Sequence, residues 1–128
     1  MANKYDSFET LLIRQKAKNL AVKIYALFKN SKDYGFKDQI QRASLSISNN
    51  IAEGYERGTN KEFRYFLFIA KGSCGEVRSM AIVGQELGYL TIEEATQIKQ
   101  ATKEISRMIA WYIQKLNAKE STKNLPSH

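Results

Sequence analysis

The chain has 128 residues, of which 43% are hydrophobic and 26% are charged, with a single proline and a formal net charge of +7. This composition excludes a disordered chain and leaves room for one compact core, and the lack of proline before Pro126 predicts an almost continuously helical body. One cysteine and one terminal histidine exclude a disulfide pair, a metal-ligand pattern and a nucleophile activated by histidine.

The first predicted element is an amphipathic helix over residues 8–28, which Asp6 or Ser7 can cap. Basic residues occupy the face opposite its apolar stripe. The apolar residues recur at three- and four-residue steps and are Phe8, Leu11, Leu12, Leu20, Ile24, Leu27 and Phe28.

Turn-forming residues at positions 30–35 separate this helix from a second one, which stops at Gly58. The stripe of the second helix is unusually regular. Its members are Phe36, Ile40, Ala43, Ile47, Ile51 and Gly54.

A third helix is predicted over residues 60–87 and a fourth over residues 92–116. Thr59 with Glu62, and Thr91 with Glu94, have the spacing of capping boxes at the two helix starts, and Gly88 ends the third helix. The third helix presents to the core Phe63, Phe66, Leu67, Ala70, Cys74, Val77, Ala81 and Leu87. The fourth presents Ala95, Ile98, Thr102, Ile105, Ile109, Tyr112 and Leu116.

Short connections between four helices favour an all-α fold, an antiparallel up-down-up-down four-helix bundle. We expect the bundle to comprise residues 1–117 and a flexible polar tail to comprise residues 118–128. We also predict self-association, because some apolar residues lie off the main stripes and need further cover. These are Ile13, Val22, Ile69, Ile82, Val83 and Ile113.

Three glycines inside the third helix, Gly72, Gly75 and Gly84, favour the close approach of a neighbouring helix or a second subunit, and flexibility is the competing account. Cys74 between them is interpreted as a core residue, since the sequence has no internal histidine that would activate a thiol. We therefore expect no enzymatic activity, no cofactor and no metal.

Polar residues border the stripes of the second and third helices, and we expect a structural hydrogen-bond network that fixes helix register. If the chain folds back at Thr59, residues equally distant from Thr59 face each other. This places Arg42 near Glu76, for which we predict an ion pair, and Glu53 near Tyr65. A ligand site is the alternative. The expected members of the network are Arg42, Asn50, Glu53, Ser73 and Glu76.

Basic residues alternate with aromatic ones around residues 55–65, a pattern that suits phosphate contacts and base stacking. The spacing alone favours a solvated face, because Glu56 and Glu62 dilute the positive charge. The net charge favours anionic partners modestly, and solubility alone also accounts for it. The candidate nucleic-acid-binding residues are Arg57, Lys61, Arg64, Lys16, Lys18 and Lys23.

The N-terminus lacks the apolar core of a signal peptide, and the longest apolar run, residues 65–70, is too short to cross a bilayer. The expected location is the cytoplasm, without a membrane.

Three strings of the sequence stand out: Asn-Ile-Ala-Glu-Gly at residues 50–54, Gly-Ser-Cys-Gly-Glu-Val at residues 72–77 and Gln-Lys-Ala at residues 15–17. In these strings, the first of which is the most specific, the chain resembles the bacterial four-helix bundle proteins encoded in intervening sequences of 23S ribosomal RNA genes. The resemblance implies a homopentamer and a distant relationship to the accessory proteins of diversity-generating retroelements, which bind nucleic acid and a reverse transcriptase.

The leading hypothesis is a non-enzymatic, oligomeric accessory protein that binds RNA or DNA through basic outer surfaces. The alternative is a structural or protein-interaction bundle with a protein partner, for which the positive charge is incidental.

Overall fold

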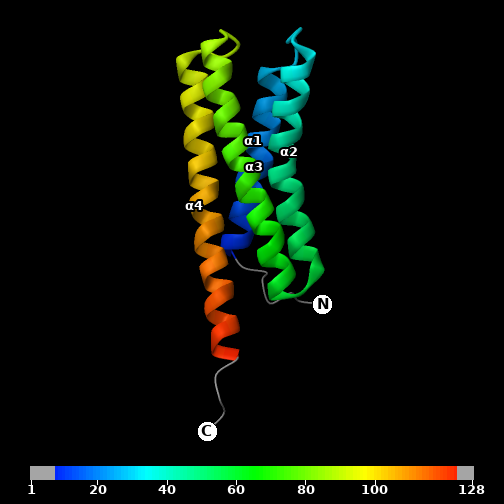
Figure 1. Cartoon of the computed structure of the whole chain (residues 1–128), viewed down its shortest axis with the longest axis vertical. Helices are drawn as coiled ribbons and strands as arrows, with labels where there is room; N and C mark the ends of the chain where they lie inside the picture. Colours follow the sequence, from blue (N-terminus) through cyan, green and yellow to red (C-terminus); the bar gives the residue numbers. More distant parts are fainter. Residues whose placement is uncertain (1–7, 124–128) are drawn as a thin grey trace.

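The computed structural model describes residues 8–123, and the side chains of residues 8–119. Within that part the chain forms four helices and no strand: α1 (Phe8–Leu27), α2 (Tyr34–Arg57), α3 (Asn60–Glu86) and α4 (Ile92–Lys123). The helices lie side by side, with the α1–α2 and α3–α4 turns at one end and the α2–α3 turn at the other (Figure 1). Each helix packs on its chain neighbours, and α4 closes the bundle against α1. The predicted antiparallel up-down-up-down bundle is confirmed.

The turn between α2 and α3 forms as the sequence predicts. Gly58 ends α2 with φ of 87°, in the left-handed region that a glycine adopts without steric cost. The N–H of Glu62 donates to the Thr59 hydroxyl over 3.1 Å, which caps the first turn of α3. These short-range signals fix where the chain reverses, and therefore which residues of α2 and α3 lie opposite each other.

The turn between α3 and α4 is equally well defined. Gly88 has φ of 78°, and the N–H of Tyr89 donates to the Gly84 carbonyl over 2.8 Å, which satisfies a free carbonyl at the end of α3. Thr91 and Glu94 form the complete capping box, with bonds of 3.0 and 2.9 Å. The residues predicted to cap α1, Asp6 and Ser7, lie outside the described residues.

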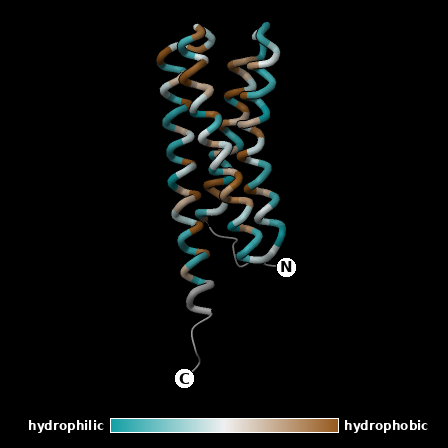
Figure 2. The backbone as a smooth tube through the Cα atoms, viewed as in Figure 1, coloured by the Kyte–Doolittle hydropathy of each residue, from teal (hydrophilic) through white to brown (hydrophobic). Residues whose placement is uncertain are grey.

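The core follows the predicted stripes in α2 and α4. Six residues of α4 are no more than 1% exposed, and hydrophobic and polar residues alternate along each helix at helical spacing (Figure 2). The predicted core position Leu87 is wrong, because it follows the last turn of α3 and is exposed. Cys74 is fully buried, which bears out its interpretation as a core residue.

The predicted stripe of α1 is wrong in its first half. Phe8 is 75% exposed and Leu11 is also exposed, whereas Ile13 and Ala17 are buried. Counted back from Phe28, the buried residues of α1 recur at three- and four-residue steps and include Ala17. A stripe assigned from the largest side chains omits this alanine.

Helix α4 is longer than predicted. It continues to Lys123 and extends past the ends of the other helices (Figure 1). The predicted helix end at residue 116 is therefore wrong, and residues 118–123, which contain neither glycine nor proline, continue the helix. Residues 124–128, with Pro126, lie outside the described residues.

Helix-interior glycines occupy two kinds of environment. A Cβ atom on Gly84 would lie 3.4 Å from Phe36 of α2 and 3.2 Å from Leu90 in the α3–α4 turn, so the predicted close approach of a neighbouring helix is confirmed there. A Cβ on Gly72 or Gly75 would have no heavy atom of the described structure within 4 Å, apart from its own helix backbone and chain neighbours. Each open glycine costs a helix about 1 kcal/mol relative to alanine. Contacts within the described part of one chain do not explain why Gly72 and Gly75 are glycines.

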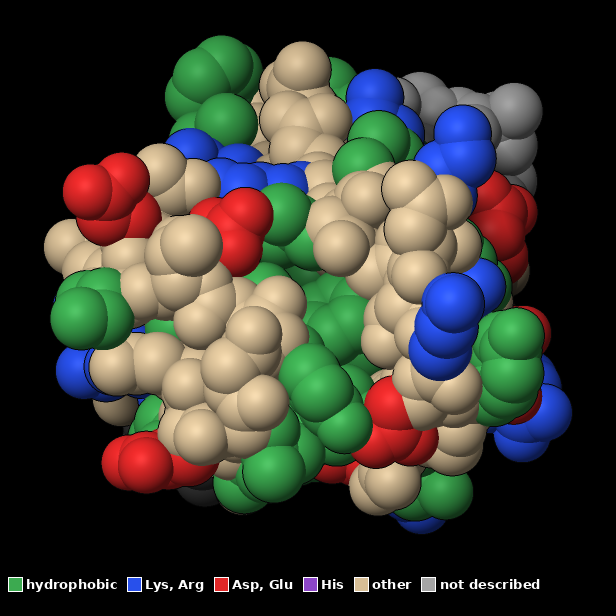
Figure 3. Space-filling view, turned by 90° about the horizontal axis from the view of Figure 1, so that it is seen from above, with side chains coloured by type: hydrophobic (Ala, Val, Ile, Leu, Met, Phe, Trp, Pro, Cys, Tyr) green, Lys and Arg blue, Asp and Glu red, His purple; other side chains and the backbone are tan. Residues whose placement is uncertain are grey.

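Hydrophobic side chains reach the surface on more than one side of the bundle, as the view along its axis shows (Figure 3). Of the predicted off-stripe residues, Ile13 and Ile113 are buried, and the prediction that they lack cover is wrong because α1 and α4 turn them into the core. The other four are exposed, namely Val22, Ile69, Ile82 and Val83. Within residues 8–123, no helix is long and apolar enough to span a membrane.

Candidate nucleic-acid interface

A small polar cluster joins the middles of α2 and α3. The hydroxyl groups of Ser46 and Ser73 lie 3.0 Å apart, and the Asn50 amide donates to the Ser46 hydroxyl over 2.9 Å and to its carbonyl over 2.8 Å. Ser73 also donates to the Ile69 carbonyl. Because these half-buried groups satisfy one another, a shift of one helix along the other would leave them unpaired. Asn50 and Ser73 therefore lie in one register-specific cluster.

The predicted ion pair between Arg42 and Glu76 is wrong. Glu76 accepts a hydrogen bond of 3.4 Å from Gln39, one turn before Arg42, and the Arg42 side chain is exposed. The reversal of the chain at Thr59 determines which residues of α2 and α3 lie at the same height along the bundle. It does not determine which side chains at that height point toward the other helix. At the level of Glu76, Gln39 projects toward α3 and Arg42 projects outward.

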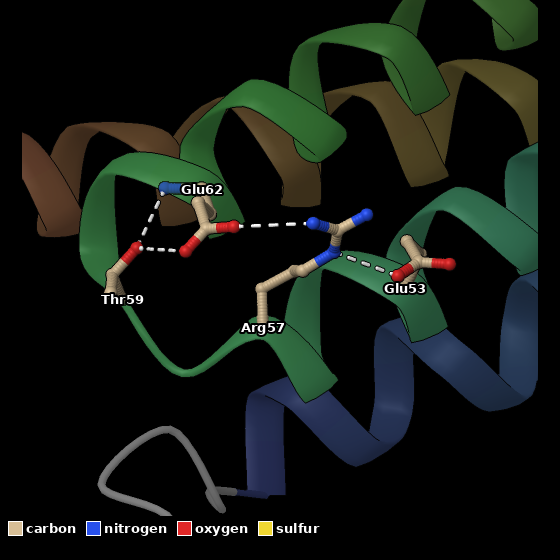
Figure 4. Close-up of polar contacts among 4 residues, drawn as sticks. All are labelled: Glu53, Arg57, Thr59 and Glu62. Carbon is tan, nitrogen blue, oxygen red and sulfur yellow. Dashed lines mark hydrogen bonds and ion pairs between the residues drawn. The ribbon is translucent and has the colours of Figure 1, made fainter.

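Arg57 lies between two carboxylates at the α2–α3 turn (Figure 4). Its Nε donates to Glu53 over 2.8 Å and its Nη1 to Glu62 over 3.4 Å. The hydrogen bond to Glu53 is the main cause of a raised pKa of Arg57. The guanidinium also lies 5.1 Å above the ring of Phe66. Two carboxylates neutralise this cation, so it offers little net charge to a phosphate.

The other predicted basic residues do not converge. Lys16 pairs with Glu104 and Lys23 bonds to Gln97, both across the α1–α4 seam. Lys18 is exposed on α1. Lys61 is exposed beside a hollow of about 480 Å³ at the α2–α3 turn, which Tyr65 also lines. The basic residues predicted from the sequence therefore lie on different sides of the bundle and do not form one surface.

A different set of cations follows the seam between α3 and α4. Arg64 is the only predicted residue in it, and its Nη1 donates to the Asn117 side chain over 3.1 Å. The set is called the basic face below and consists of Arg64, Lys71 and Arg78 on α3 with Lys99 and Lys103 on α4.

Arg78 ties the centre of the basic face together. Its Nε donates to the Thr102 hydroxyl over 3.2 Å and its Nη2 to the Ser106 hydroxyl over 3.3 Å. The Thr102 hydroxyl in turn donates to the Lys99 carbonyl. Hydroxyl partners orient the half-buried guanidinium and leave its positive charge intact. Among the described residues, Arg78 has no carboxylate partner.

Cys74 lies under this seam. Burial raises the pKa of its thiol to about 11, against the opposing effects of the Ser106 hydrogen bond and the Arg78 charge. The thiol therefore stays protonated at neutral pH and is a poor nucleophile.

No cation of the basic face has an aspartate or glutamate three or four residues away on its own helix. Within the described part of the chain, Lys71, Lys99 and Lys103 make no hydrogen bond or ion pair through their amines. The available signals were the seven-residue spacing of Arg64, Lys71 and Arg78 and the absence of acids three or four residues from each of them. No group of three His, Cys, Asp or Glu side chains suited to a metal occurs among residues 8–119.

These features define an antiparallel four-helix bundle with a row of basic residues along one helix seam. A family model for the 23S rRNA-intervening sequence protein matches residues 9–110. The chain therefore belongs to the 23S rRNA-intervening sequence protein family.

A search of curated proteins finds none that matches this chain. Among solved structures, the chain is similar to a protein of unknown function from the S23 ribosomal protein family of Bacteroides thetaiotaomicron VPI-5482, whose crystal structure was determined at 1.70 Å resolution. The TM-score is 0.78 at 23% sequence identity, over 84% of this chain and 99% of that one. The similarity at this identity supports the fold.

Proposed function

We propose that this chain is a non-enzymatic, oligomeric protein that binds nucleic acid through the basic face. The single observation that carries the proposal is the row of cations along the α3–α4 seam, of which Lys71, Arg78, Lys99 and Lys103 form no ion pair with the described residues. Five cations lie on two adjoining helices, and none has an acid three or four residues away on its own helix, where side chains would pair. An uncompensated row of Lys and Arg is the electrostatic signature of phosphate binding.

The dimensions of the basic face suit a nucleic-acid backbone. Arg64 and Arg78 are 14 residues apart, which corresponds to about 21 Å of helix at about 1.5 Å per residue. Phosphates of one duplex strand advance by about 3.4 Å along the axis, so the face spans about six of them. The flexible amines of Lys71 and Lys103 reach outward, while Arg78 is oriented by its hydroxyl partners. RNA and DNA share this phosphate chemistry.

A charge-reversal experiment tests the basic face directly. The variant Lys71→Glu/Lys99→Glu/Lys103→Glu is compared with Lys32→Glu/Lys61→Glu/Lys115→Glu, which changes the net charge equally at exposed positions elsewhere. Binding to a labelled RNA hairpin and a DNA duplex is followed by fluorescence anisotropy at about 0.1 M salt. We expect a loss of about 100-fold or more for the first variant, because each lost phosphate contact weakens binding by nearly tenfold at this salt concentration.

The control variant should lose less than about fivefold, because its three positions are distributed around the bundle. Equal losses for the two variants would mean that total charge, and not the basic face, controls binding. No binding of the unaltered protein at low salt would overturn the proposed function itself. Circular dichroism of both variants verifies the helical fold.

The exposed apolar residues favour a second role, self-association or binding of a protein partner. Val22 is 63% exposed and Ile82 is 49% exposed, which is unfavourable for a chain that acts alone in water. We propose that copies self-associate, and that the pentamer implied by the family resemblance is the first assembly to test. A protein partner such as a reverse transcriptase is the alternative, and nuclease-resistant copurification with a defined partner supports it.

A further inference from the structure

Trp111 is the only tryptophan of the chain, and its side chain is 42% exposed on α4. The indole lines a hollow of about 300 Å³ between the first turns of α1 and the second half of α4. Ile13 and Met108 contribute apolar side chains to the same hollow. A large aromatic ring that stays partly exposed beside an apolar hollow offers a flat surface on which another ring can stack.

The exposed side of α4 connects this hollow to the basic face. Along it, a row of side chains at steps of four residues consists of Lys99, Lys103, Arg107 and Trp111. Arg107 is exposed and lines the hollow, one turn after Lys103 of the basic face. Lys103 and Trp111 are eight residues apart, which corresponds to about 12 Å of helix. A strand covers this distance with about three nucleotides at the duplex advance of about 3.4 Å each.

The charges around the hollow suit a nucleotide. Arg107 lies at its edge on α4, and Glu104, three residues before Arg107, is paired with Lys16. Glu9 lines the hollow from α1. Its carboxylate repels a phosphate but accepts hydrogen bonds from the amino groups that adenine, cytosine and guanine carry. The edge of the hollow therefore suits a phosphate, and the hollow itself suits a base.

Neighbours on α4 hold the indole of Trp111 in place. The Lys115 amine lies over the ring, 4.5 Å from its centroid, and the ring of Tyr112 meets the indole in an edge contact with centroids 6.0 Å apart. These contacts restrict the exposed side chain before a ligand binds, so less conformational entropy is lost on binding. The attraction to the indole also occupies the Lys115 amine, which we assign to the ring and not to a phosphate.

We infer that Trp111 is the stacking platform for one unpaired base of a nucleic acid whose backbone follows the basic face. The inference rests on the proposed function and names its substrate class, RNA or DNA with unpaired nucleotides beside the bound strand. The base lies in the hollow against the indole, Arg107 binds its phosphate, and Glu9 accepts from its amino group. A base inside an uninterrupted duplex is paired and stacked between its neighbours, so its ring cannot reach the indole.

The single tryptophan makes this contact observable by fluorescence. The emission of Trp111 is followed during titration with a single strand of mixed sequence and about 12 nucleotides, as RNA and as DNA, and with the blunt-ended duplex of the same length. We expect the single strands to quench the emission and the duplex to leave it nearly unchanged, because only an unpaired base stacks on the indole. Fluorescence anisotropy of labelled probes gives the affinities in parallel.

Three substitutions that leave the net charge unchanged separate stacking from phosphate binding. Trp111→Leu should weaken single-strand binding by about tenfold or more and should change duplex binding by less than about twofold. Trp111→Phe should restore most of the single-strand affinity, because a phenyl ring also stacks. Tyr34→Leu is the matched control with no expected loss, since it removes an exposed aromatic ring at the start of α2, at the other end of the bundle. Circular dichroism verifies the fold of each variant.

Equal single-strand affinities for Trp111→Leu and Tyr34→Leu would overturn the stacking site and leave the basic face intact. Single strands that bind without quenching Trp111, or a duplex that quenches it equally, would have the same meaning. An unaltered protein that binds neither kind of probe at low salt would instead overturn the proposed function, and the stacking site with it.

Discussion

The α2–α3 pair and the α1–α4 pair are both antiparallel neighbours, but they are held together in different ways. Between α2 and α3, a Cβ on Gly54 would lie 2.8 Å from the Cβ of Phe66, and the contact between Ser46 and Ser73 closes the centre of the pair. This interface combines a close backbone approach with half-buried hydrogen bonds. Both depend on one exact alignment of the two helices.

The α1–α4 seam is more open. Hollows of about 260 and 300 Å³ lie along it, and polar side chains bridge it. The ion pair between Lys16 and Glu104 has side chains that are 37% and 45% exposed. Long exposed side chains can hold two helices at several relative offsets, so this seam contributes less to register. The comparison indicates that the α2–α3 pair, in the centre of the chain, fixes the alignment of the helices. Helices α1 and α4 pack against this pair and complete the bundle.

The largest expected effect comes from filling the close approach in the α2–α3 pair. Gly54→Leu should lower the free energy of unfolding by about 3 kcal/mol, because the new side chain has no space beside Phe63 and Phe66. Gly35→Leu, at an exposed position of the same helix, should change it by less than about 1 kcal/mol. Urea denaturation measures both. Similar losses of unfolding free energy for the two variants would show that the close approach at Gly54 does not distinguish the α2–α3 pair.

A smaller effect is expected at the hydroxyl cluster of the same pair. Ser46→Ala should cost about 1–2 kcal/mol, because Ser73 and Asn50 each lose a half-buried partner. A double-mutant cycle with Ser73→Ala should give a coupling energy of about 0.5–1.5 kcal/mol. Additive losses within error would show that the two hydroxyl groups do not stabilise each other.

The α1–α4 seam should respond less. Lys16→Met should cost about 0.2–1 kcal/mol, and its coupling to Glu104→Gln should decrease as salt rises, because both groups are largely solvated. Thermal unfolding at 0.05 and 0.5 M salt measures this, with Lys18→Met as the exposed control. A coupling as large as that of the Ser46 cycle, and insensitive to salt, would make the two seams equivalent.

The smallest effect concerns the contact between the two turns at one end of the bundle. The Tyr89 hydroxyl donates to Asp33 over 2.6 Å, and this bond is the main cause of the lowered pKa of Asp33. A lowered carboxyl pKa stabilises the fold above the unfolded value of about 3.9, and this stabilisation is lost as pH falls through the folded pKa.

The stability difference between the unaltered protein and Tyr89→Phe should therefore be constant from about pH 5 to 8 and should shrink below about pH 4. On the alkaline side, the pKa of Tyr89 is raised, mainly by the same bond to Asp33, so the difference should also diminish above about pH 10. Thermal unfolding across this pH series measures it. A difference independent of pH would assign the effect of Tyr89 to packing.

The sequence predicted the centre of the chain best. Thr59 and Gly58 determine the reversal between α2 and α3 through local hydrogen bonds and backbone conformation, and such signals are contained in a few adjacent residues. In α1, consecutive apolar residues permit more than one stripe. Tertiary packing selects the one that includes Ile13 and Ala17. The identity of the buried face is therefore decided by the neighbouring helices.

The candidate site was only partly predictable for a related reason. Arg57 and Lys16 are basic in the sequence, but their carboxylate partners make them poor ligands for phosphate. Glu104 is distant from Lys16 in sequence and meets it only through the fold. Conversely, Lys71 and Lys103 come together only because α3 and α4 are adjacent. Of the basic residues predicted from the sequence, Arg64 alone belongs to the basic face.

The salt dependence of binding tests the central claim, that the basic face binds phosphates, most directly. Five contacts predict a slope of log affinity against log salt concentration of about −3.5 to −4.5 for RNA or DNA. Lys71→Gln should make this slope shallower by about 1, and Lys115→Gln should leave it unchanged. A slope near zero, or one that the two substitutions alter equally, would contradict the account.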